Sequence, residues 1–178
     1  AFDMLNWFFG EPIKVSGKLS TSIKERPMPN SYELLEVTSE DICLANLEIS
    51  NYTNNLIPCQ ISLSSIAKNG RGFSLEVYGS EGSLTLKSEN QKDYVHGFNL
   101  KFSSKNDKTY NLTADPLYNF EKTWTDGRIA PVRRIQNLWA ESIFNKTPII
   151  PGLSEGLKSQ RVCEAIRKSS ESGLNMKI

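Results

Sequence analysis

The sequence predicts an α+β fold, an open and mainly antiparallel β-sheet with helices packed on one face. Two observations lead to this prediction. Through the middle of the chain apolar and polar residues alternate with period two, which indicates about seven strands joined by short polar loops. Helical spacing of apolar residues is confined to the two ends, so strands are followed by helices and do not alternate with them.

The first element is a helix over residues 2–9, where apolar side chains share one stripe before Gly10 and Pro12 stop it. The helix lacks a favourable N-cap, because Ala1 has no side chain that could accept a hydrogen bond and hydrophobic residues follow at once. We therefore expect the chain to continue before Ala1 in a longer protein. Asp3 is unusual among these neighbours: it is either an exposed carboxylate favoured by the helix dipole or a functional group.

Strands are expected next, each with its apolar residues on one face. The first starts at Ile13, and the two prolines within residues 26–30 break it. Others cover residues 41–50, 56–68 and 94–102, and a last short segment carries Tyr110 and Leu112. The residues expected to face inward in the first three strands are Ile13, Val15, Gly17, Leu19, Cys43, Ala45, Leu47, Ile49, Cys59, Ile61 and Leu63.

Residues 73–86 predict the central hairpin of the sheet. Leu75 and Val77 alternate with polar residues, four turn-prone residues from Gly79 to Gly82 follow, and the alternation then resumes. Glycine adopts positive φ without a Cβ penalty. We therefore expect these two glycines to set the register of the strands that pair outward from the hairpin.

Two helices end the chain. Pro131 suits the first position of a helix, and apolar residues recur at helical spacing from there until residues 146–148. The last helix is expected to begin near Ser154 as its N-cap, with Glu155 favourably placed against the helix dipole, and to end near Gly173. The stripe of this helix runs through Val162, Ala165, Ile166 and Ser169.

The length and the net charge of the chain limit the number of domains and the kinds of partner that we expect. A chain of 178 residues suits one compact domain, residues 1–178, that buries roughly 70% of its unfolded surface. The 21 basic and 20 acidic residues nearly cancel and form no basic run, which argues against a nucleic-acid or anionic-membrane partner. No apolar stretch approaches the roughly 20 residues that span a bilayer, and the start lacks the features of a signal segment, so no membrane association is expected.

The cysteines and the glycosylation sequons indicate the cellular compartment in which the protein is expected. The cysteines are Cys43, Cys59 and Cys163. An odd number of distant thiols with apolar neighbours suits a reducing, cytoplasmic environment. The glycosylation sequons are at Asn51, Asn111 and Asn145. They permit a different interpretation, a secreted sugar-binding domain with glycans, but chance matches in a chain rich in Asn, Ser and Thr are favoured.

Familiar catalytic motifs are absent or incomplete. Gly70 and Gly72 imitate the start of a dinucleotide fingerprint, but the third glycine is missing and a strand follows, so no cofactor-binding residue is assigned. No metal-ligand spacing occurs, and no metal residue is assigned. His96 is the single histidine, and a histidine in such a strand is more often a packed, hydrogen-bonded residue than a catalytic base.

A short loop before the second-last predicted element, the helix that starts at Pro131, carries a second group of candidate residues. Trp124, Asp126 and Arg128 bring together an aromatic face, a carboxylate and a guanidinium, which suits binding of a polar ring compound such as a sugar. The alternative, a surface turn with ordinary charges, is favoured. These three residues are the candidate substrate-binding residues of the loop.

Three segments resemble the C-terminal domain of the Gfo/Idh/MocA oxidoreductases. The hairpin, with EVYGSEGSL at residues 76–84, resembles the central hairpin of that domain. Residues 3–12, DMLNWFFGEP, are similar to the segment just past the active-site turn of the family, and residues 156–166, GLKSQRVCEAI, are similar to its last helix. The three segments occur in the order of the family and span almost the whole chain.

This resemblance implies a fold, a reaction and site residues. It implies that a Rossmann domain holding NAD or NADP belongs before this chain, which then supplies the substrate-binding and oligomerisation domain, as in the two-domain dehydrogenases of the dihydrodipicolinate reductase type. The implied reaction is hydride transfer between NAD(P) and a hydroxyl or keto carbon of a sugar, cyclitol or nucleotide sugar. Asp3 matches the position that assists proton transfer, and Asn6 takes a position that is a histidine in some members.

The chain alone, without its cofactor domain, is expected to be inactive, and the family histidine would fall before Ala1. The resemblance and the apolar strands imply a homo-oligomer formed through the open sheet face. Asn6 and the missing fingerprint leave an alternative from another class: a non-catalytic, sheet-based binding or assembly module with the same fold.

Overall fold

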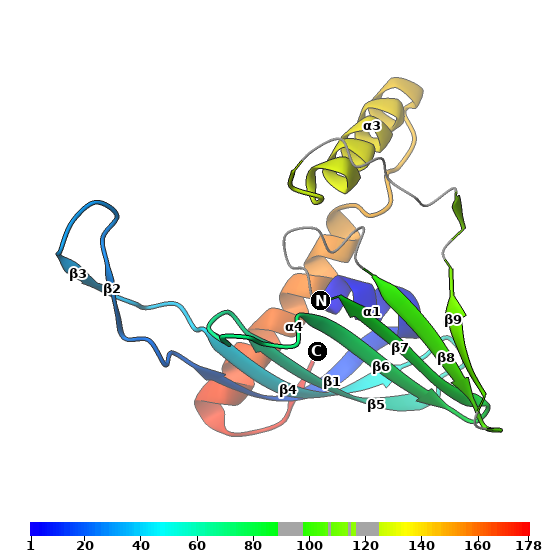
Figure 1. Cartoon of the computed structure of the whole chain (residues 1–178), viewed down its shortest axis with the longest axis horizontal. Coiled ribbons are helices and arrows are strands. Elements are labelled where there is room, and N and C mark those ends of the chain that lie inside the picture. The colour runs from blue at the N-terminus through cyan, green and yellow to red at the C-terminus, as the bar shows by residue number, and fades with distance from the viewer. Residues whose placement is uncertain (89–97, 107, 114, 117–124) are drawn as a thin grey trace. The chain divides into compact units, whose positions relative to one another are not determined.

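The chain folds into two compact units, residues 1–68 with 150–178, and residues 69–149 (Figure 1). The computed structural model describes residues 1–88, 98–106, 108–113, 115–116 and 125–178. Strands pair antiparallel in both units, and helices lie near the two ends of the sequence, so the predicted α+β class is confirmed. The described strands form two four-stranded sheets and one two-stranded hairpin, where a single open sheet was expected.

The first unit contains a four-stranded sheet in the order β10-β1-β4-β5. Its strands are β1 (Glu11–Ser20), β4 (Ile42–Ser50), β5 (Leu56–Ser64) and β10 (Met176–Lys177). Val15, Leu47 and Cys59 are register partners across three strands. The predicted inward set is confirmed at its centre, because Val15, Ala45, Leu47 and Ile49 are buried.

The prediction is wrong for two residues of this inward set, Ile13 and Leu63, which are exposed. β1 and β4 shift register between Pro12 and Lys14. This bulge inverts the alternation at the start of β1, so Pro12 is buried and Ile13 is 38% exposed. At the other end Leu63 is 41% exposed, and β5 stops at Ser64 instead of continuing to residue 68.

Helices α1 (Phe2–Phe9) and α4 (Leu153–Ser172) complete the first unit (Figure 1). Each helix ends at a glycine, Gly10 for α1 and Gly173 for α4, as predicted. The stripe of α4 is also confirmed, since its buried residues are Val162, Ala165, Ile166 and Ser169.

The cap of α4 differs from the prediction. Its N-cap is Gly152, and Ser154 lies inside the first turn. The Glu155 carboxylate accepts the Gly152 amide at 2.7 Å, which satisfies one of the amides that a helix start leaves unpaired. The Ser154 hydroxyl donates to the same carboxylate at 2.5 Å. Glu155 therefore performs the capping that the sequence assigned to its neighbour.

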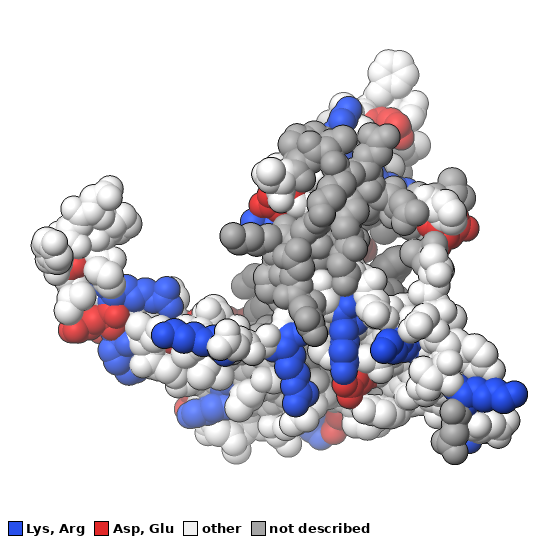
Figure 2. Space-filling model, in the orientation of Figure 1, with Lys and Arg blue, Asp and Glu red and all other residues white. Residues whose placement is uncertain are grey.

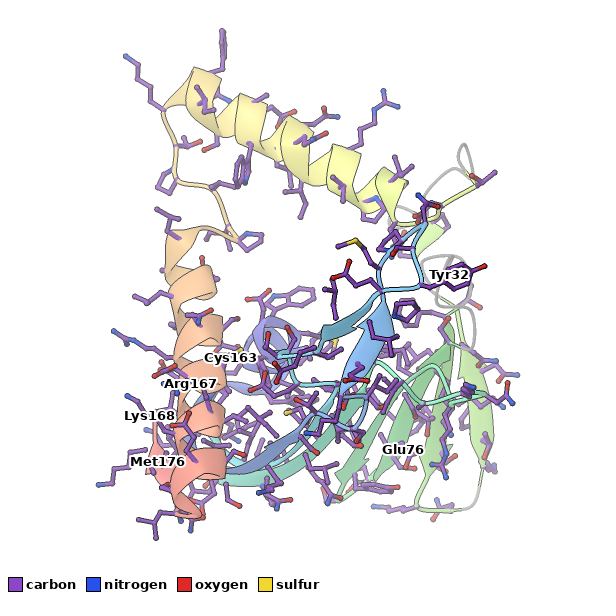
Figure 3. All side chains as sticks on the ribbon, turned by 90° about the vertical axis from the view of Figure 1, so that its left-hand side faces the viewer. Tyr32, Glu76, Cys163, Arg167, Lys168 and Met176 are labelled. Atoms are coloured by element: carbon purple, nitrogen blue, oxygen red, sulfur yellow. The ribbon has the colours of Figure 1, made fainter. Side chains whose placement is uncertain are left out.

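A hairpin of β2 (Glu25–Pro27) and β3 (Leu34–Glu36) leaves the end of β1, where the sequence predicted only a break. Its root is fixed by Asp41, whose carboxylate accepts the amides of Ser22 and Ile23 at 2.8 and 2.9 Å. Figure 3 shows Tyr32 in the loop of this hairpin, where its side chain is fully exposed.

The second unit contains a sheet in the order β6-β7-β8-β9. The strands are β6 (Phe73–Gly79), β7 (Gly82–Ser88), β8 (Asn99–Ser104) and β9 (Thr109–Leu112). The central hairpin is confirmed, but its turn is shorter than predicted, because Gly79 and Gly82 pair with each other across it. Of the two glycines only Gly82 has positive φ, at 149°.

Helix α3 (Ile129–Asn145) also belongs to the second unit. It begins two residues before Pro131, so that proline is not its first residue. The helix ends at Asn145, followed by Lys146 in a left-handed conformation. None of its residues is buried within the described chain, and Trp139 and Ile143 are exposed. Tyr94 and His96, from the strand predicted at 94–102, lie outside the described residues.

Candidate functional site

A cavity of about 700 Å³ in the first unit brings together two of the candidate residues, Asp3 and Asn6. Four segments surround it: the exposed side of α1, the bulged start of β1, the β4–β5 turn and the start of α4. The residues that line it are Asp3, Asn6, Trp7, Gly10, Glu11, Ile13, Ser50, Asn51, Tyr52, Asn54, Ile150, Pro151, Glu155 and Lys158. Its size is within the range of small-molecule sites.

Helix α1 presents three adjoining side chains to this cavity. Asp3, Asn6 and Trp7 are spaced i, i+3 and i+4, which places them on one helical face. The Trp7 side chain is 73% exposed and stacks on Phe8 with ring centroids 5.0 Å apart. Asp3 is exposed in the first turn, so it fits both interpretations left open by the sequence, a dipole-favoured carboxylate and a functional group.

Another part of the cavity wall comes from the start of α4, through Glu155 and Lys158. Hydrogen bonds from the Ser154 hydroxyl and the Gly152 amide lower the pKa of Glu155, so it is a carboxylate at neutral pH. Lys158 lies one turn further along the helix and lowers the same pKa by its charge. The cavity thus contains an aromatic ring, amide and hydroxyl groups, and charges of both signs.

A second hollow of about 570 Å³ lies over the same sheet but has less to offer a ligand. It includes Lys14 and Glu48, whose charged groups bind each other at 2.8 Å. Its other polar residues are Ser16, Asn46, Gln60 and Asn175. Because its cation and carboxylate are already paired, we take the cavity beside α1 as the candidate site.

The remaining candidate residues lie in the second unit. Asp126 and Arg128 are brought together: the Asp126 carboxylate accepts the Arg128 Nε–H at 2.9 Å and a terminal N–H at 2.6 Å. This guanidinium, with the Arg128 amide, lowers the pKa of Asp126 to about 2. Trp124, the third member of the predicted group, lies outside the described residues.

Several side chains that line the cavity were not singled out from the sequence. Trp7 had a usable signal, because it follows Asp3 by four residues on a predicted helix. Tyr52 and Lys158 had none, since they reach the cavity from a strand turn and from a helix more than a hundred residues later in the chain. Ile13 reaches it only because of the β-bulge.

Figure 2 shows Lys and Arg side chains in separate positions over the face in view, with Asp and Glu among them. No described helix combines the length and the apolar character needed to cross a membrane. Within the same residues, no three His, Cys, Asp or Glu side chains gather in a way that would hold a metal ion.

Comparison with known proteins gives a family match over the whole chain. The family model GFO_IDH_MocA_C, described as the oxidoreductase family, C-terminal alpha/beta domain, matches residues 1–178. An uncharacterized oxidoreductase of Synechocystis sp. is 39% identical over 171 residues, which cover 96% of this chain and 45% of that protein. The chain therefore spans less than half the length of this relative.

Solved structures share the fold at low sequence identity. An NAD binding oxidoreductase from Klebsiella pneumoniae superposes with a TM-score of 0.74 at 22% identity, covering 99% of this chain and 47% of that one. Levoglucosan dehydrogenase, in complex with NADH and levoglucosan, has a TM-score of 0.70 at 17% identity, covering 99% of this chain and 48% of that one. In each case the match covers about half of the solved chain.

Proposed function

The chain belongs to the Gfo/Idh/MocA oxidoreductase family, as its C-terminal alpha/beta domain, and from this premise we propose that it forms the substrate side of an NAD(P)-dependent sugar or polyol oxidoreductase. In this proposal residues 1–178 act as one substrate-binding and oligomerisation domain, and a cofactor-binding Rossmann domain forms the rest of the protein. The names of the relatives, an oxidoreductase and a sugar dehydrogenase, support the class of reaction.

The observation that carries the proposal is the composition of the cavity beside α1. It places an aromatic ring, Trp7, next to a carboxylate, Asp3, and an amide, Asn6. Sugars and polyols combine apolar ring faces with several hydroxyls, so their recognition uses a flat apolar surface together with hydrogen-bonding groups. The charged residues Glu155 and Lys158, which also line the cavity, provide further partners for hydroxyl groups.

In the proposed reaction this chain transfers the proton of the substrate hydroxyl and orients the substrate. Asp3 accepts the proton of the substrate hydroxyl as the carbon is oxidised and returns it in the reverse direction. Asn6 donates a hydrogen bond from its amide to a neighbouring oxygen, and Trp7 limits the tilt of the ring. The dinucleotide, when bound, supplies or accepts the hydride.

The described residues around Gly70 and Gly72, the motif that resembled a dinucleotide fingerprint, do not form a pyrophosphate site. Gly72 leads directly into strand β6, so no helix N-terminus follows the glycines. We therefore assign NAD or NADP to the rest of the protein, and we derive no step of the reaction from cofactor contacts made here. Trp124, Asp126 and Arg128 remain proposed substrate contacts from the second unit.

The proposal is tested on the full-length protein with NAD⁺ or NADP⁺ and a panel of sugars, cyclitols and nucleotide sugars, by following reduced nicotinamide at 340 nm. The substrate that is turned over is then used with the variant Asp3→Asn, which should lower kcat by about 10²–10⁴-fold. Glu33→Gln, the same chemical change in the exposed β2–β3 hairpin, should leave kcat unchanged. Full activity of Asp3→Asn would remove Asp3 from the mechanism.

The isolated chain should show no saturable turnover with either nicotinamide, because in this proposal the rest of the protein binds the cofactor. A non-catalytic binding or assembly module is the second candidate, favoured by Asn6 in place of an ionisable histidine. Sugar binding by the full-length protein, detected by calorimetry without any nicotinamide turnover, would select this second candidate.

A further inference from the structure

The Tyr52 hydroxyl donates hydrogen bonds to backbone carbonyls in the last turn of helix α1. The Tyr52 Oη–H lies 2.9 Å from the carbonyl oxygen of Trp7 and 3.2 Å from that of Asn6. The Asn6 carbonyl also accepts the Gly10 amide at 3.2 Å. The Trp7 carbonyl is one of the last carbonyls of the helix, which have no partner within it, so the Tyr52 hydroxyl is an outside donor that stabilises the final turn. One hydroxyl proton is shared between two carbonyls of the residues that line the cavity.

Helix α1 depends on such contacts for its orientation. It has eight residues, its N-cap Ala1 makes no side-chain hydrogen bond, and Leu5 is its buried residue. Isolated helices shorter than about 12 residues are marginal in water, so tertiary contacts decide where this one lies. After the helix, Gly10 approaches β4 so closely that a Cβ would lie 2.2 Å from the Ser50 carbonyl oxygen.

The turn that carries Tyr52 is itself well ordered by hydrogen bonds. The Asn51 side-chain oxygen accepts the amides of Thr53 and Asn55 at 3.0 and 2.8 Å, and the Thr53 hydroxyl at 2.9 Å. The Asn51 amide donates to the Asn55 carbonyl at 2.9 Å. Tyr52 is therefore attached to a fixed part of the β4–β5 sheet edge rather than to a free loop.

From these contacts we propose that Tyr52 is a positioning residue for the catalytic face of α1. It ties the helix that carries Asp3, Asn6 and Trp7 to the β4–β5 turn and so sets where the Asp3 carboxylate meets the substrate. Misplacing a reacting group by about 1 Å can lower the rate on the order of 10²-fold. A hydrogen bond that fixes the position of α1 therefore affects the rate of the reaction. The inference rests on the proposed function for the role of Asp3.

The variant Tyr52→Phe keeps the ring and removes the hydroxyl. Tyr52 is 76% exposed, so water replaces part of the lost hydrogen bonding, and in the full-length protein we expect kcat to fall about 3- to 10-fold with a smaller change in KM. In an Asp3→Asn background the same substitution should cost less than twofold, because there is no longer a carboxylate to misplace. Tyr32→Phe, at the fully exposed tyrosine of the β2–β3 hairpin, is the matched control and should leave kcat unchanged.

Amide hydrogen exchange gives a second readout that does not require turnover. Tyr52→Phe should speed exchange in residues 1–10 and leave β4 and β5 at their wild-type rates, even if no sugar proves to be a substrate. Unchanged exchange in α1, or an equal loss of kcat in the Asp3→Asn background, would overturn the positioning role. Absence of turnover in every variant, with faster exchange in α1, would count against the proposed function alone.

Discussion

The Ser169 hydroxyl on α4 accepts a hydrogen bond from the Gly17 amide of β1 at 3.0 Å, across 152 residues of sequence. The same hydroxyl donates to the Leu174 carbonyl at 2.6 Å. Next along the strand, the Ser170 hydroxyl accepts the Leu19 amide at 2.9 Å. β10 pairs with β1 at Lys14 and Val15, and the two serines continue the hydrogen bonding of β1 beyond Val15.

Ser169→Ala should destabilise the protein by about 1–3 kcal/mol. The substitution leaves a part-buried amide and a carbonyl without partners, and Ser169 itself is buried. The free energy of unfolding from urea titration of the full-length protein measures the loss. Ser172→Ala, on the same helix but exposed, should cost much less, because water replaces its hydrogen bonds. Equal losses for the two variants would contradict this account.

Two glycines should respond to alanine in opposite directions. Gly82 has φ 149°, and a Cβ there would lie 2.2 Å from the Ser103 carbonyl oxygen, so Gly82→Ala should destabilise by more than about 1 kcal/mol. Gly156 lies in α4 with nothing within 4 Å of the same position. Gly156→Ala should therefore stabilise by roughly 0.5–1 kcal/mol. Thermal unfolding of both variants checks the signs.

Asp41 should make stability depend on acid pH. The amides of Ile23 and Ser22 lower the pKa of its carboxyl, so the native state favours the charged form. The stabilisation is complete at neutral pH and is lost as pH falls below about 4, through the native pKa. Asp41→Asn should lower the unfolding midpoint at pH 7 and flatten its decline below pH 4. The neighbouring, exposed Glu40→Gln should preserve the wild-type slope.

The Asp126–Arg128 pair should be visible in a carboxyl titration followed by NMR. We expect a pKa of about 2 for Asp126. Arg128→Gln removes the guanidinium that lowers it most and should raise this pKa toward its ordinary value of about 4, though not fully, because the backbone amide of residue 128 still donates. Lys87→Gln, in the same unit, should not change it, because the Lys87 ammonium pairs with Glu76 and is not among the causes of the shift. An Asp126 pKa near 4 in the unmodified protein would refute the pairing.

Self-association through the sheet of the second unit is a further expectation. One face of this sheet is apolar, and its residues Leu84, Tyr110 and Leu112 remain exposed within the described chain. A second copy of this surface would cover them. Leu112→Glu should weaken the dimer in sedimentation velocity, whereas Asn111→Glu, the next residue on the opposite face of β9, should not. A monomer at all concentrations would contradict the expectation.

Much of the fold could be predicted, because local patterns record which side of each element meets the core. The period-two run through Ala45, Leu47 and Ile49 and the stripe of α4 both correspond to buried faces. The predictions failed where one backbone detail reversed a pattern. The bulge after Pro12 exposed Ile13, and the Glu155 carboxylate, one residue beyond Ser154, capped α4.

By itself, then, the sequence determined the class of fold, the family and the two residues of α1, Asp3 and Asn6, that the cavity brings together. Only the tertiary structure added Tyr52 and Lys158 to them, since these residues come from a turn and a helix distant in the chain. The physical reason is that periodicity reports burial against a core, whereas a cavity is made by exposed side chains from several elements, whose meeting is decided by how those elements pack.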